Sequence, residues 1–426
     1  MKTTPLGVPQ VAAIRGRTPA YLQTLQCLGC GAVYPPDTLM NLCFGDQRPV
    51  QMVLDLDQLQ REQPNQSWYH PDREDMWRFG GLMPLDSARA DDREDIVSLG
   101  EGATMLQDLP DYPLAKRAGF RLRVKNEAVN PTGSFKDRGM SVVVSMARRM
   151  GVRGLVVPTQ GNAGDSLAVY AVAGGLKVAV IMPDDTPAPI ISRVSELSRK
   201  HAHVVLELVS GTIREASQVM DEIYLPQGYF NCATFQEPGW RIEGKKTLGL
   251  EIAEPTANGG EWHLPDVIVY PTGGGTGIVG MWKAFDELQV LGLIGSERPR
   301  MICVQSAATA PVVEAFDAGA DDTTPVEPGK TLATGLNVPG GVGHQRVLGI
   351  IRASSGAAVS VTEEEIASAL QELWRERGLW YGPEGAACFA ALEQLVQRGL
   401  INKGDEVVTF NTGAFDKYLP ELKHLL

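Results

Sequence analysis

The chain has 426 residues, of which 43% are hydrophobic and 21% are charged, a balance that is ordinary for a soluble globular enzyme. This length exceeds the usual size of one hydrophobic core, so we expect two domains and an extension. The formal net charge of -12 at pH 7 argues against nucleic acid or an anionic membrane surface as the main partner.

The sequence contains no run of about 18 apolar residues, and its first ten residues, MKTTPLGVPQ, lack the apolar core of a signal peptide. We therefore expect no membrane segment and a cytoplasmic location. The six cysteines stand at positions 27, 30, 43, 232, 303 and 388. They are too few and too scattered for a disulfide framework in a chain of this length, so we expect reduced thiols.

Residues 1–95 have tryptophan and tyrosine scattered among charges and few periodic segments, which indicates an extension without a large core of its own. Cys27 and Cys30, in the sequence CLGCG, have the spacing of a zinc knuckle, which wraps backbone N–H groups around thiolates. Cys43 could be a third ligand, and Asp46 could in principle complete a site in which a fourth cysteine is missing. The interpretation we favour is a degenerate knuckle held by packing, so no metal is predicted.

From Leu122 onward, short apolar runs rich in β-branched residues alternate with stretches of helix length. Such runs are typical of buried parallel strands, and they occupy 155–158, 178–182, 204–208, 267–270, 301–304 and 407–410. Helices are expected at 190–201, 245–253, 278–288 and 366–377, the last of them behind a capping-box spacing at 362–365. The alternation predicts an α/β fold with helices on both faces of its sheets.

Residues 130–139 read Asn-Pro-Thr-Gly-Ser-Phe-Lys-Asp-Arg-Gly and place Lys136 between a turn and an apolar, helix-compatible run at 140–150. A lysine that starts a helix feels the positive end of the macrodipole, which lowers the cost of losing its proton. An amine poised to be neutral is what Schiff-base chemistry with a carbonyl cofactor needs.

This decapeptide resembles the pyridoxal-phosphate lysine motif of the threonine synthase family. That family belongs to the fold-type-II group, which also contains threonine dehydratases and O-acetylserine sulfhydrylases. The resemblance covers roughly residues 97–420, with a weaker trace over 20–60. It implies that Lys136 carries the pyridoxal 5'-phosphate, that Phe135 lies close to the cofactor ring, and that Ser134 contacts the substrate.

Residues 158–164, Pro-Thr-Gln-Gly-Asn-Ala-Gly, follow an expected strand and open a helix, so their N–H groups face any anion above the strand end. They resemble the Ser-Thr-Gly-Asn motif of the family. The resemblance implies that Asn162 hydrogen-bonds the 3-oxygen of the cofactor, and that Thr159 and Gln160 bind the substrate carboxylate. Gln160 departs from the family pattern, as does Asp165, and this leaves the exact substrate open.

Residues 269–277, Val-Tyr-Pro-Thr-Gly-Gly-Gly-Thr-Gly, form a second strand-loop-helix pattern with a nest of glycines. The spacing at 275–280 also satisfies a dinucleotide-binding fingerprint, which requires an acidic residue about 20 residues on, at the end of the next strand. That strand runs into Gln305-Ser306 instead, so a smaller phosphate ester fits better. The resemblance implies that this loop holds the cofactor phosphate through Gly273, Gly274, Gly275, Thr276 and Gly277.

The last expected strand ends in Phe410-Asn411-Thr412-Gly413, where the resemblance implies that Thr412 hydrogen-bonds the pyridine nitrogen. A neutral hydroxyl leaves that nitrogen largely unprotonated, which favours elimination and replacement over transamination.

Residues 240–247, Trp-Arg-Ile-Glu-Gly-Lys-Lys-Thr, resemble the family's Arg-x-Glu-Gly-Gln-Lys-Thr, with Lys245 where glutamine is usual. The family's arginine holds the substrate phosphate through bidentate hydrogen bonds, which implies that role for Arg241. Residues 100–104 resemble the family's Gly-Glu-Gly-x-Thr entry loop. Glu384 receives no role beyond helix start and packing on the cofactor side.

The resemblance implies a fold-type-II enzyme with two doubly wound open sheets and the cofactor in the cleft between its domains. We expect an N-terminal extension at 1–95, a large domain at 96–132 and 250–426, and a small domain at 133–249. By analogy with the family we also expect a homodimer.

The implied reaction converts O-phospho-L-homoserine and water to L-threonine and phosphate by γ-elimination and β-addition. The alternative is a lyase or β-replacement enzyme on the same scaffold, such as a serine/threonine dehydratase, a diaminopropionate ammonia-lyase or a cysteate synthase. A dinucleotide-dependent oxidoreductase rests on the glycine spacing alone.

Overall fold

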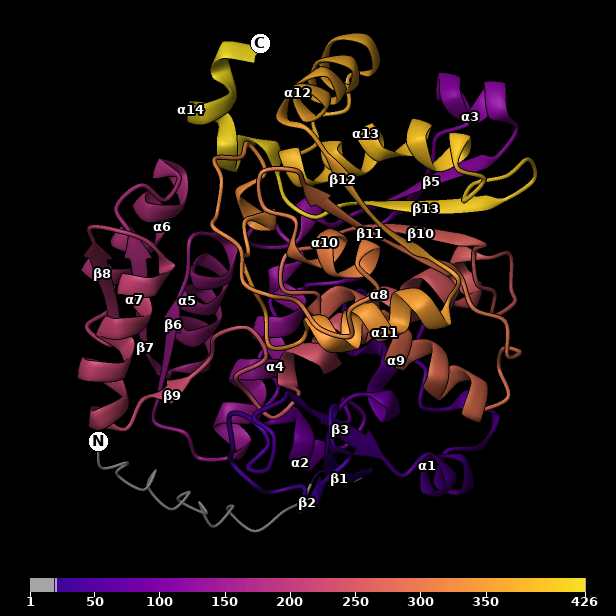
Figure 1. The fold of residues 1–426 in the computed structure, drawn as a ribbon. Helices are drawn as coiled ribbons and strands as arrows, with labels where there is room; N and C mark the ends of the chain where they lie inside the picture. Colours follow the sequence, from indigo (N-terminus) through magenta and orange to yellow (C-terminus); the bar gives the residue numbers. More distant parts are fainter. Residues whose placement is uncertain (1–18, 20, 426) are drawn as a thin grey trace.

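The computed structural model describes residues 19 and 21–425, so the opening segment MKTTPLGVPQ lies outside the described residues. The described chain contains a three-stranded, a four-stranded and a six-stranded sheet (Figure 1). None of its described helices combines the length and the apolar character needed to cross a membrane.

The four-stranded sheet is parallel throughout and has the order β8-β7-β6-β9. Its strands are β6 (Gly154–Pro158), β7 (Lys177–Pro183), β8 (Val204–Val209) and β9 (Phe230–Asn231), and the helices along this stretch are α4 (Lys136–Arg149), α5 (Asn162–Gly174), α6 (Ala188–Lys200) and α7 (Ile213–Val219). Every residue of β6 is buried, which is why its sequence is continuously apolar. The three strands predicted in this region are confirmed.

The six-stranded sheet has the order β12-β11-β10-β13-β5-β4, with β4 antiparallel at one edge and the other pairings parallel. Its strands are β4 (Leu106–Asp108), β5 (Arg121–Asn126), β10 (Val267–Pro271), β11 (Arg300–Ser306), β12 (Ala357–Val361) and β13 (Glu406–Asn411). The helices that accompany it are α3 (Pro113–Ala118), α8 (Trp240–Ala253), α9 (Thr276–Val290), α10 (Pro311–Asp317), α11 (His344–Ala353), α12 (Glu363–Gln371) and α13 (Pro383–Gln397).

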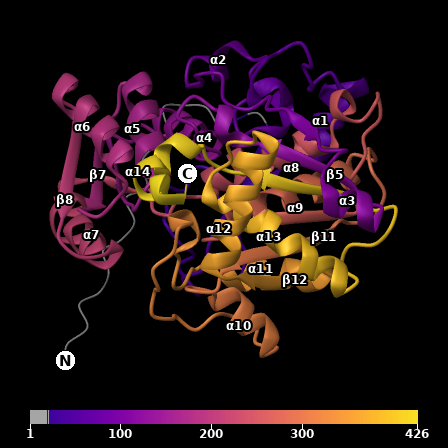
Figure 2. The same ribbon diagram turned by 90° about the horizontal axis from the view of Figure 1, so that it is seen from above.

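Seen from above, the elements of the two large sheets lie on opposite sides of the molecule, with α14 (Leu419–Leu422) between them (Figure 2). The turn before α14 contacts the four-stranded half directly, because Lys417 Nζ lies 2.7 Å from Asp165 Oδ2 on α5. The end of the chain therefore joins the two halves.

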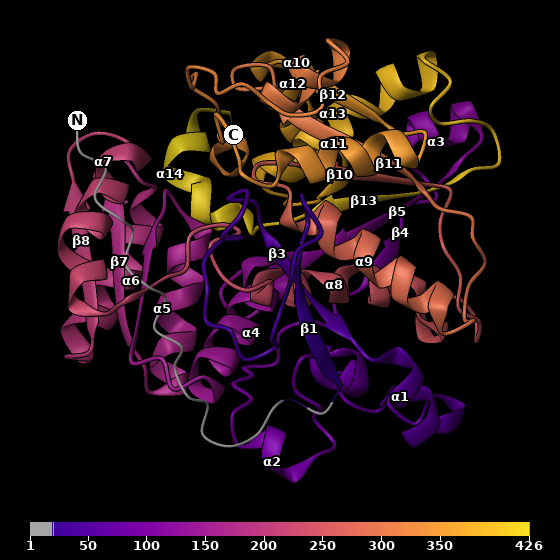
Figure 3. The same cartoon turned by 60° about the horizontal axis from the view of Figure 1, so that its bottom comes forward.

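The N-terminal segment forms a small antiparallel sheet of β1 (Leu22–Cys27), β2 (Val33–Tyr34) and β3 (Val50–Leu54), followed by α1 (Leu56–Glu62) and α2 (Ala90–Arg93). Figure 3 shows β1 and β3 on the side of the molecule where α4, α8 and α9 lie. Buried apolar side chains of this segment, among them Leu25, Trp68 and Trp77, belong to the same hydrophobic cluster as the inward faces of α4 and α8. The segment therefore shares its core with the rest of the protein.

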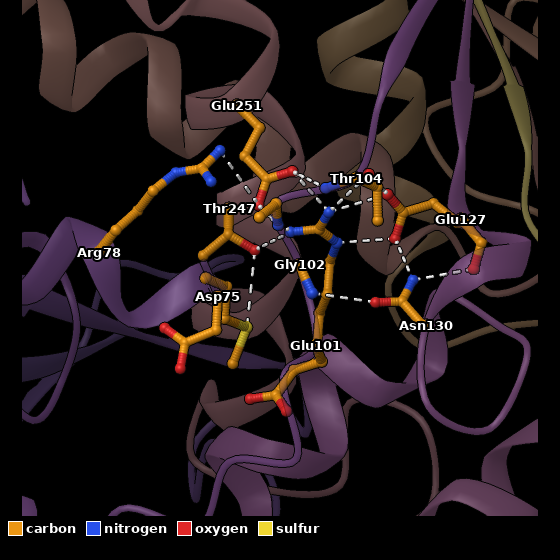
Figure 4. Close-up of polar contacts among 12 residues, drawn as sticks. Asp75, Arg78, Glu101, Gly102, Thr104, Glu127, Asn130, Thr247 and Glu251 are labelled. Carbon is orange, nitrogen blue, oxygen red and sulfur yellow. Dashed lines mark hydrogen bonds and ion pairs between the residues drawn. The ribbon is translucent and has the colours of Figure 1, made fainter. Parts of the chain in front are cut away.

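A buried ion network joins α4 to α8 and to the end of β5. The guanidinium of Arg138 donates to Glu127 at 2.7 and 2.8 Å and to Glu251 at 2.7 Å through each of two nitrogens. All three side chains are fully buried. Figure 4 shows Glu127 and Glu251 facing one another, with Thr104 and Thr247 beside them. Burial raises the pKa of Glu251, but the charges of Arg138 and Lys125 outweigh it and hold that pKa well below its usual range.

We predict that Arg138→Met strongly destabilises the protein, because it leaves two buried carboxylates without their main partner. Breaking a buried pair in this way typically costs about 3–5 kcal/mol. The matched control is Arg117→Met, which removes an exposed ion pair with Glu393 and should cost at most about 1 kcal/mol. The midpoint of urea unfolding, followed by tryptophan fluorescence, measures both; similar midpoints for the two variants would contradict a structural role for the network.

Candidate active site

Lys136 is the first residue of α4, as the sequence predicts, and its side chain lines a cleft between the two large sheets. The turn before it is fixed by Asp137, which accepts hydrogen bonds from Thr132 N at 2.7 Å and from Ser166 Oγ at 2.5 Å. Burial, reinforced by the nearby charge of Arg241, lowers the pKa of Lys136 to about 8. The amine therefore loses its proton far more readily than an ordinary lysine does.

Four helices begin at or beside this cleft without a side-chain cap at their N-termini, namely α4, α5, α9 and α13. The first N–H groups of a helix have no partner within the helix, and the macrodipole adds positive potential there. Residues from the first turn of each line the cleft, as Lys136, Asn162, Thr276 and Glu384 do. The cleft is thus built to receive an anionic ligand.

The loop from Gly273 to Gly277 lines one wall of the cleft, and its shape requires glycine. Gly275 has a φ of +89° and is followed directly by the first turn of α9. A Cβ at Gly277 would collide with the hydroxyl of Tyr270, and one at Gly273 would lie 2.6 Å from the carbonyl oxygen of Gly335. Such a loop ahead of a helix N-terminus fits a phosphate group.

Asn162, Phe135 and Thr412 line the cleft around Lys136, so all the predicted cofactor-binding residues come together. Asn162 Nδ2 donates to the hydroxyl of Tyr418 at 2.8 Å, whereas its Oδ1 is buried and has no hydrogen-bond partner among the described residues. Thr412 accepts the N–H of Phe135 through its carbonyl oxygen at 3.0 Å, and its side chain faces the cleft. An unpartnered amide oxygen, a cradle of glycines and a reactive amine fit pyridoxal phosphate.

None of the four predicted substrate-binding residues is among the described residues that line the cleft, but the charge of Arg241 acts on Lys136. Its guanidinium donates to Thr234 Oγ1 at 3.2 Å and to the carbonyl oxygen of Cys232, and Thr234 itself lines the cleft. Ser134 is buried and forms a backbone bridge with Gly413. The remaining two are Thr159, which is buried, and Gln160, which is half-buried; neither lines the cleft within the described residues.

Asp165 departs from the family pattern, and for this reason the sequence does not identify the exact substrate. The residue is not among those that line the cleft. Its carboxylate is fully buried and pairs with Lys417 at 2.7 Å and with Arg193 at 3.1 Å. Asp165 therefore joins α5 to α6 and to the segment before α14. These two ion pairs account for an aspartate at this position of the motif.

Three residues of the site receive no chemical role from the sequence. Glu384 lines the cleft, accepts the N–H of Gly335 at 2.8 Å, and keeps one buried oxygen without a partner; burial raises its pKa. Tyr418 lies beside it. Lys245 is fully buried and donates to the carbonyl oxygen of Phe135, and burial together with the charge of Lys136 lowers its pKa well below the usual value. The turn-to-helix sequence Gly-Pro-Glu is the only signal that points to Glu384.

The fold and the site define a class of protein: an α/β enzyme with a reactive lysine and a phosphate cradle in a cleft between two sheets. Comparison with known proteins agrees with this class. Residues 97–413 match the model of the family "Pyridoxal-phosphate dependent enzyme". The chain belongs to the pyridoxal-phosphate-dependent enzyme family.

Two curated relatives resemble nearly the whole chain. The threonine synthase of Methanosarcina acetivorans is 31% identical over 91% of this chain and 91% of its own length. The threonine synthase of Methanocaldococcus jannaschii is 30% identical, with the same coverage of both chains. Among solved structures, the processed threonine deaminase isoform 2 of Solanum lycopersicum aligns with a TM-score of 0.61 and 22% identity, covering 78% of this chain and 89% of that one.

These findings confirm the predicted fold-type-II architecture, the pyridoxal 5'-phosphate cofactor and the assignment to the pyridoxal-phosphate-dependent lyases. The substrate is a small molecule of the amino-acid type.

We predict that the reloading of cofactor-free enzyme with pyridoxal phosphate depends on pH through Lys136. With a pKa of about 8, roughly 10% of this amine is uncharged at pH 7, against about 0.04% of an ordinary lysine. The rate of appearance of the yellow chromophore should therefore rise with pH and level off above about pH 8. Lys136→Ala should form no chromophore, and a rate that keeps rising toward pH 10 would contradict the lowered pKa.

The variant Glu384→Gln extends this test. The charge of Glu384 raises the pKa of Lys136 against the effect of burial, so removing it should shift the midpoint of reloading to lower pH. An unchanged midpoint would show that Glu384 exerts no charge on the amine.

Proposed function

We propose that this chain is a threonine synthase, which converts O-phospho-L-homoserine and water to L-threonine and phosphate. The observation that carries the proposal is the buried Arg241, which bonds Thr234 at the cleft and acts electrostatically on Lys136. A substrate with a carboxylate alone does not need this additional positive charge, whereas a phosphorylated amino acid does.

The proposed chemistry assigns a task to each of these groups. Bound pyridoxal phosphate supplies an electron sink for the charge that develops at the substrate's Cα. The amine of Lys136 takes the Cα proton and a Cβ proton as general base, and returns protons to Cγ and to Cα as general acid. Arg241 and Thr234 hold the phosphate, which leaves from Cγ, and a water molecule adds at Cβ to give threonine. The hydroxyl of Thr412 is a neutral partner for the ring nitrogen, which suits elimination and addition.

The proposal includes an assembly and a location. The cofactor sits between a small domain at 133–249 and a large domain at 96–132 and 250–426, and the enzyme acts as a cytoplasmic homodimer. Ser134, Thr159 and Gln160 bind the substrate carboxylate when the small domain closes over it, and this closure excludes water from the cleft.

The second candidate is a lyase or β-replacement enzyme acting on an unphosphorylated amino acid. Two observations favour it: the fold is shared with threonine deaminase, and the guanidinium of Arg241 donates to the carbonyl oxygen of Cys232. A dehydratase has no phosphate to hold, so the two candidates differ in what they require of Arg241.

We predict that enzyme with its visible chromophore releases phosphate and threonine in equal amounts from O-phosphohomoserine. Lys136→Ala should abolish both products. Arg241→Ala should lower kcat/KM by roughly 10- to 100-fold, as expected for hydrogen bonds to a charged group, while the exposed control Arg199→Ala should leave it unchanged. A loaded enzyme that is silent on this substrate but releases ammonia from serine or diaminopropionate would establish the second candidate.

A further inference from the structure

The N-terminal segment brings four potential metal ligands together at a distance from the cleft. They are Cys27 at the end of β1, Cys30 in the turn that follows, and Cys43 and Asp46 on the loop that leads to β3. One ligand atom from each lies within 4.8 Å of all the others.

The separations within the cluster match the edges of a coordination tetrahedron. Cys30 Sγ lies 3.7 Å from Cys43 Sγ, and Cys27 Sγ lies 3.2 Å from Asp46 Oδ1. With metal–sulfur and metal–oxygen bonds of about 2.3 and 2.0 Å, a tetrahedral zinc ion has ligand-to-ligand distances of roughly 3.5–3.8 Å. The side chains need little movement to close around an ion.

The backbone directs hydrogen-bond donors at two of the sulfur atoms. The N–H of Gly29 points to Cys27 Sγ at 3.3 Å, and the N–H of Gly45 points to Cys43 Sγ at 3.4 Å. The hydroxyl of Tyr34 accepts the N–H of Phe44 and lies 3.1 Å from Cys43 Sγ, so its proton is available to that sulfur. Backbone N–H groups placed around the sulfur atoms in this way are typical of a zinc knuckle.

The carboxylate of Asp46 occupies the fourth corner in a fixed orientation. The N–H of Arg48 donates to Asp46 Oδ1 at 3.0 Å. A Cβ at residue 29 would collide with Asp46 Oδ2, so only glycine lets the two turns approach this closely. Hydrogen bonds that orient a ligand from outside the coordination shell are typical of metal sites.

We propose that Cys27, Cys30, Cys43 and Asp46 bind one zinc ion in a closed, tetrahedral structural site. Three thiolates exclude magnesium and calcium, which prefer oxygen ligands, and a tetrahedral set with sulfur suits zinc. The competing interpretation is the knuckle held by packing alone that the sequence favours, in which the thiol of Cys27 donates to Asp46 without an ion.

The position of the site indicates what the ion stabilises. Just before Cys43, the side chain of Asn41 donates to the carbonyl oxygens of Asn231 and Gln236 at 3.2 and 2.5 Å. Glu237, which follows Gln236 in the chain, accepts the N–H of Arg241 at 3.1 Å. The zinc therefore fixes a loop that supports the segment around Arg241.

The test is the metal content of the full chain, purified with its cofactor under reducing conditions from zinc-containing medium. We expect one zinc per chain, released in step with thiol modification by a mercurial and detected with a chromogenic chelator. Cys43→Ser should lose the zinc, whereas the control Cys303→Ser, which alters a buried cysteine on β11, should retain it. Zinc-free protein, a Cys30–Cys43 disulfide, or equal zinc in both variants would overturn the proposal.

Cobalt substitution supplies a second readout that does not depend on the folding of a Cys43 variant. Wild-type protein loaded with Co²⁺ should show the intense visible d–d bands of a tetrahedral site, at longer wavelengths than the cofactor absorbs. Asp46→Cys should keep the metal and increase the thiolate charge-transfer absorbance by about one third, because four thiolates replace three. Weak octahedral bands, or an Asp46→Cys spectrum identical to wild type, would contradict the proposed ligand set.

Discussion

The pairing of Arg138 with Glu127 and Glu251 is the constraint on which the rest of the site depends. Charges in a dry interior persist only when they are paired and hydrogen-bonded, so an arrangement of α4, α8 and β5 that separated these charges would be costly. The network also binds the loop at Thr104, whose hydroxyl donates to Glu127 at 2.6 Å. Since Arg138 lies two residues after Lys136, the geometry of the reactive amine follows from the packing of α4 against α8 and β5.

The local charge at the cleft is opposite in sign to the net charge of the whole chain. The protein carries a formal net charge of -12, yet uncapped helix N-termini lie at the cleft and the charge of Arg241 acts on Lys136 beside them. Burial makes this local field effective because little water screens it. Burial is the main cause of the lowered pKa of Lys136, and the charge of Arg241 adds to it, so the positive charge that suits an anionic cofactor also assists the loss of this proton.

The parts of the molecule that could be predicted from sequence are those decided by local backbone geometry. A turn followed by a lysine and a helix, or a strand followed by a glycine loop, can be predicted from sequence because the residues that form it are consecutive in the chain. Strand β5 could not be predicted, because Arg123 and Lys125 interrupt its apolar pattern and find their acidic partners far along the chain. The contact of Asn162 with Tyr418 spans 256 residues and leaves no local signal.

The N-terminal segment links the general fold to the proposed specificity. The family model begins at residue 97. The alignments with the threonine synthases of Methanosarcina acetivorans and Methanocaldococcus jannaschii cover 91% of the chain, so they include part of the segment before residue 97. In this segment Trp77 donates to Glu101 at 3.1 Å, and Glu101 accepts from Tyr170 on α5 at 2.7 Å. Strand β3 packs on α8, which carries Arg241. The segment thus supports Arg241 and the helices around the reactive lysine from one side, outside the part of the chain that the family model covers.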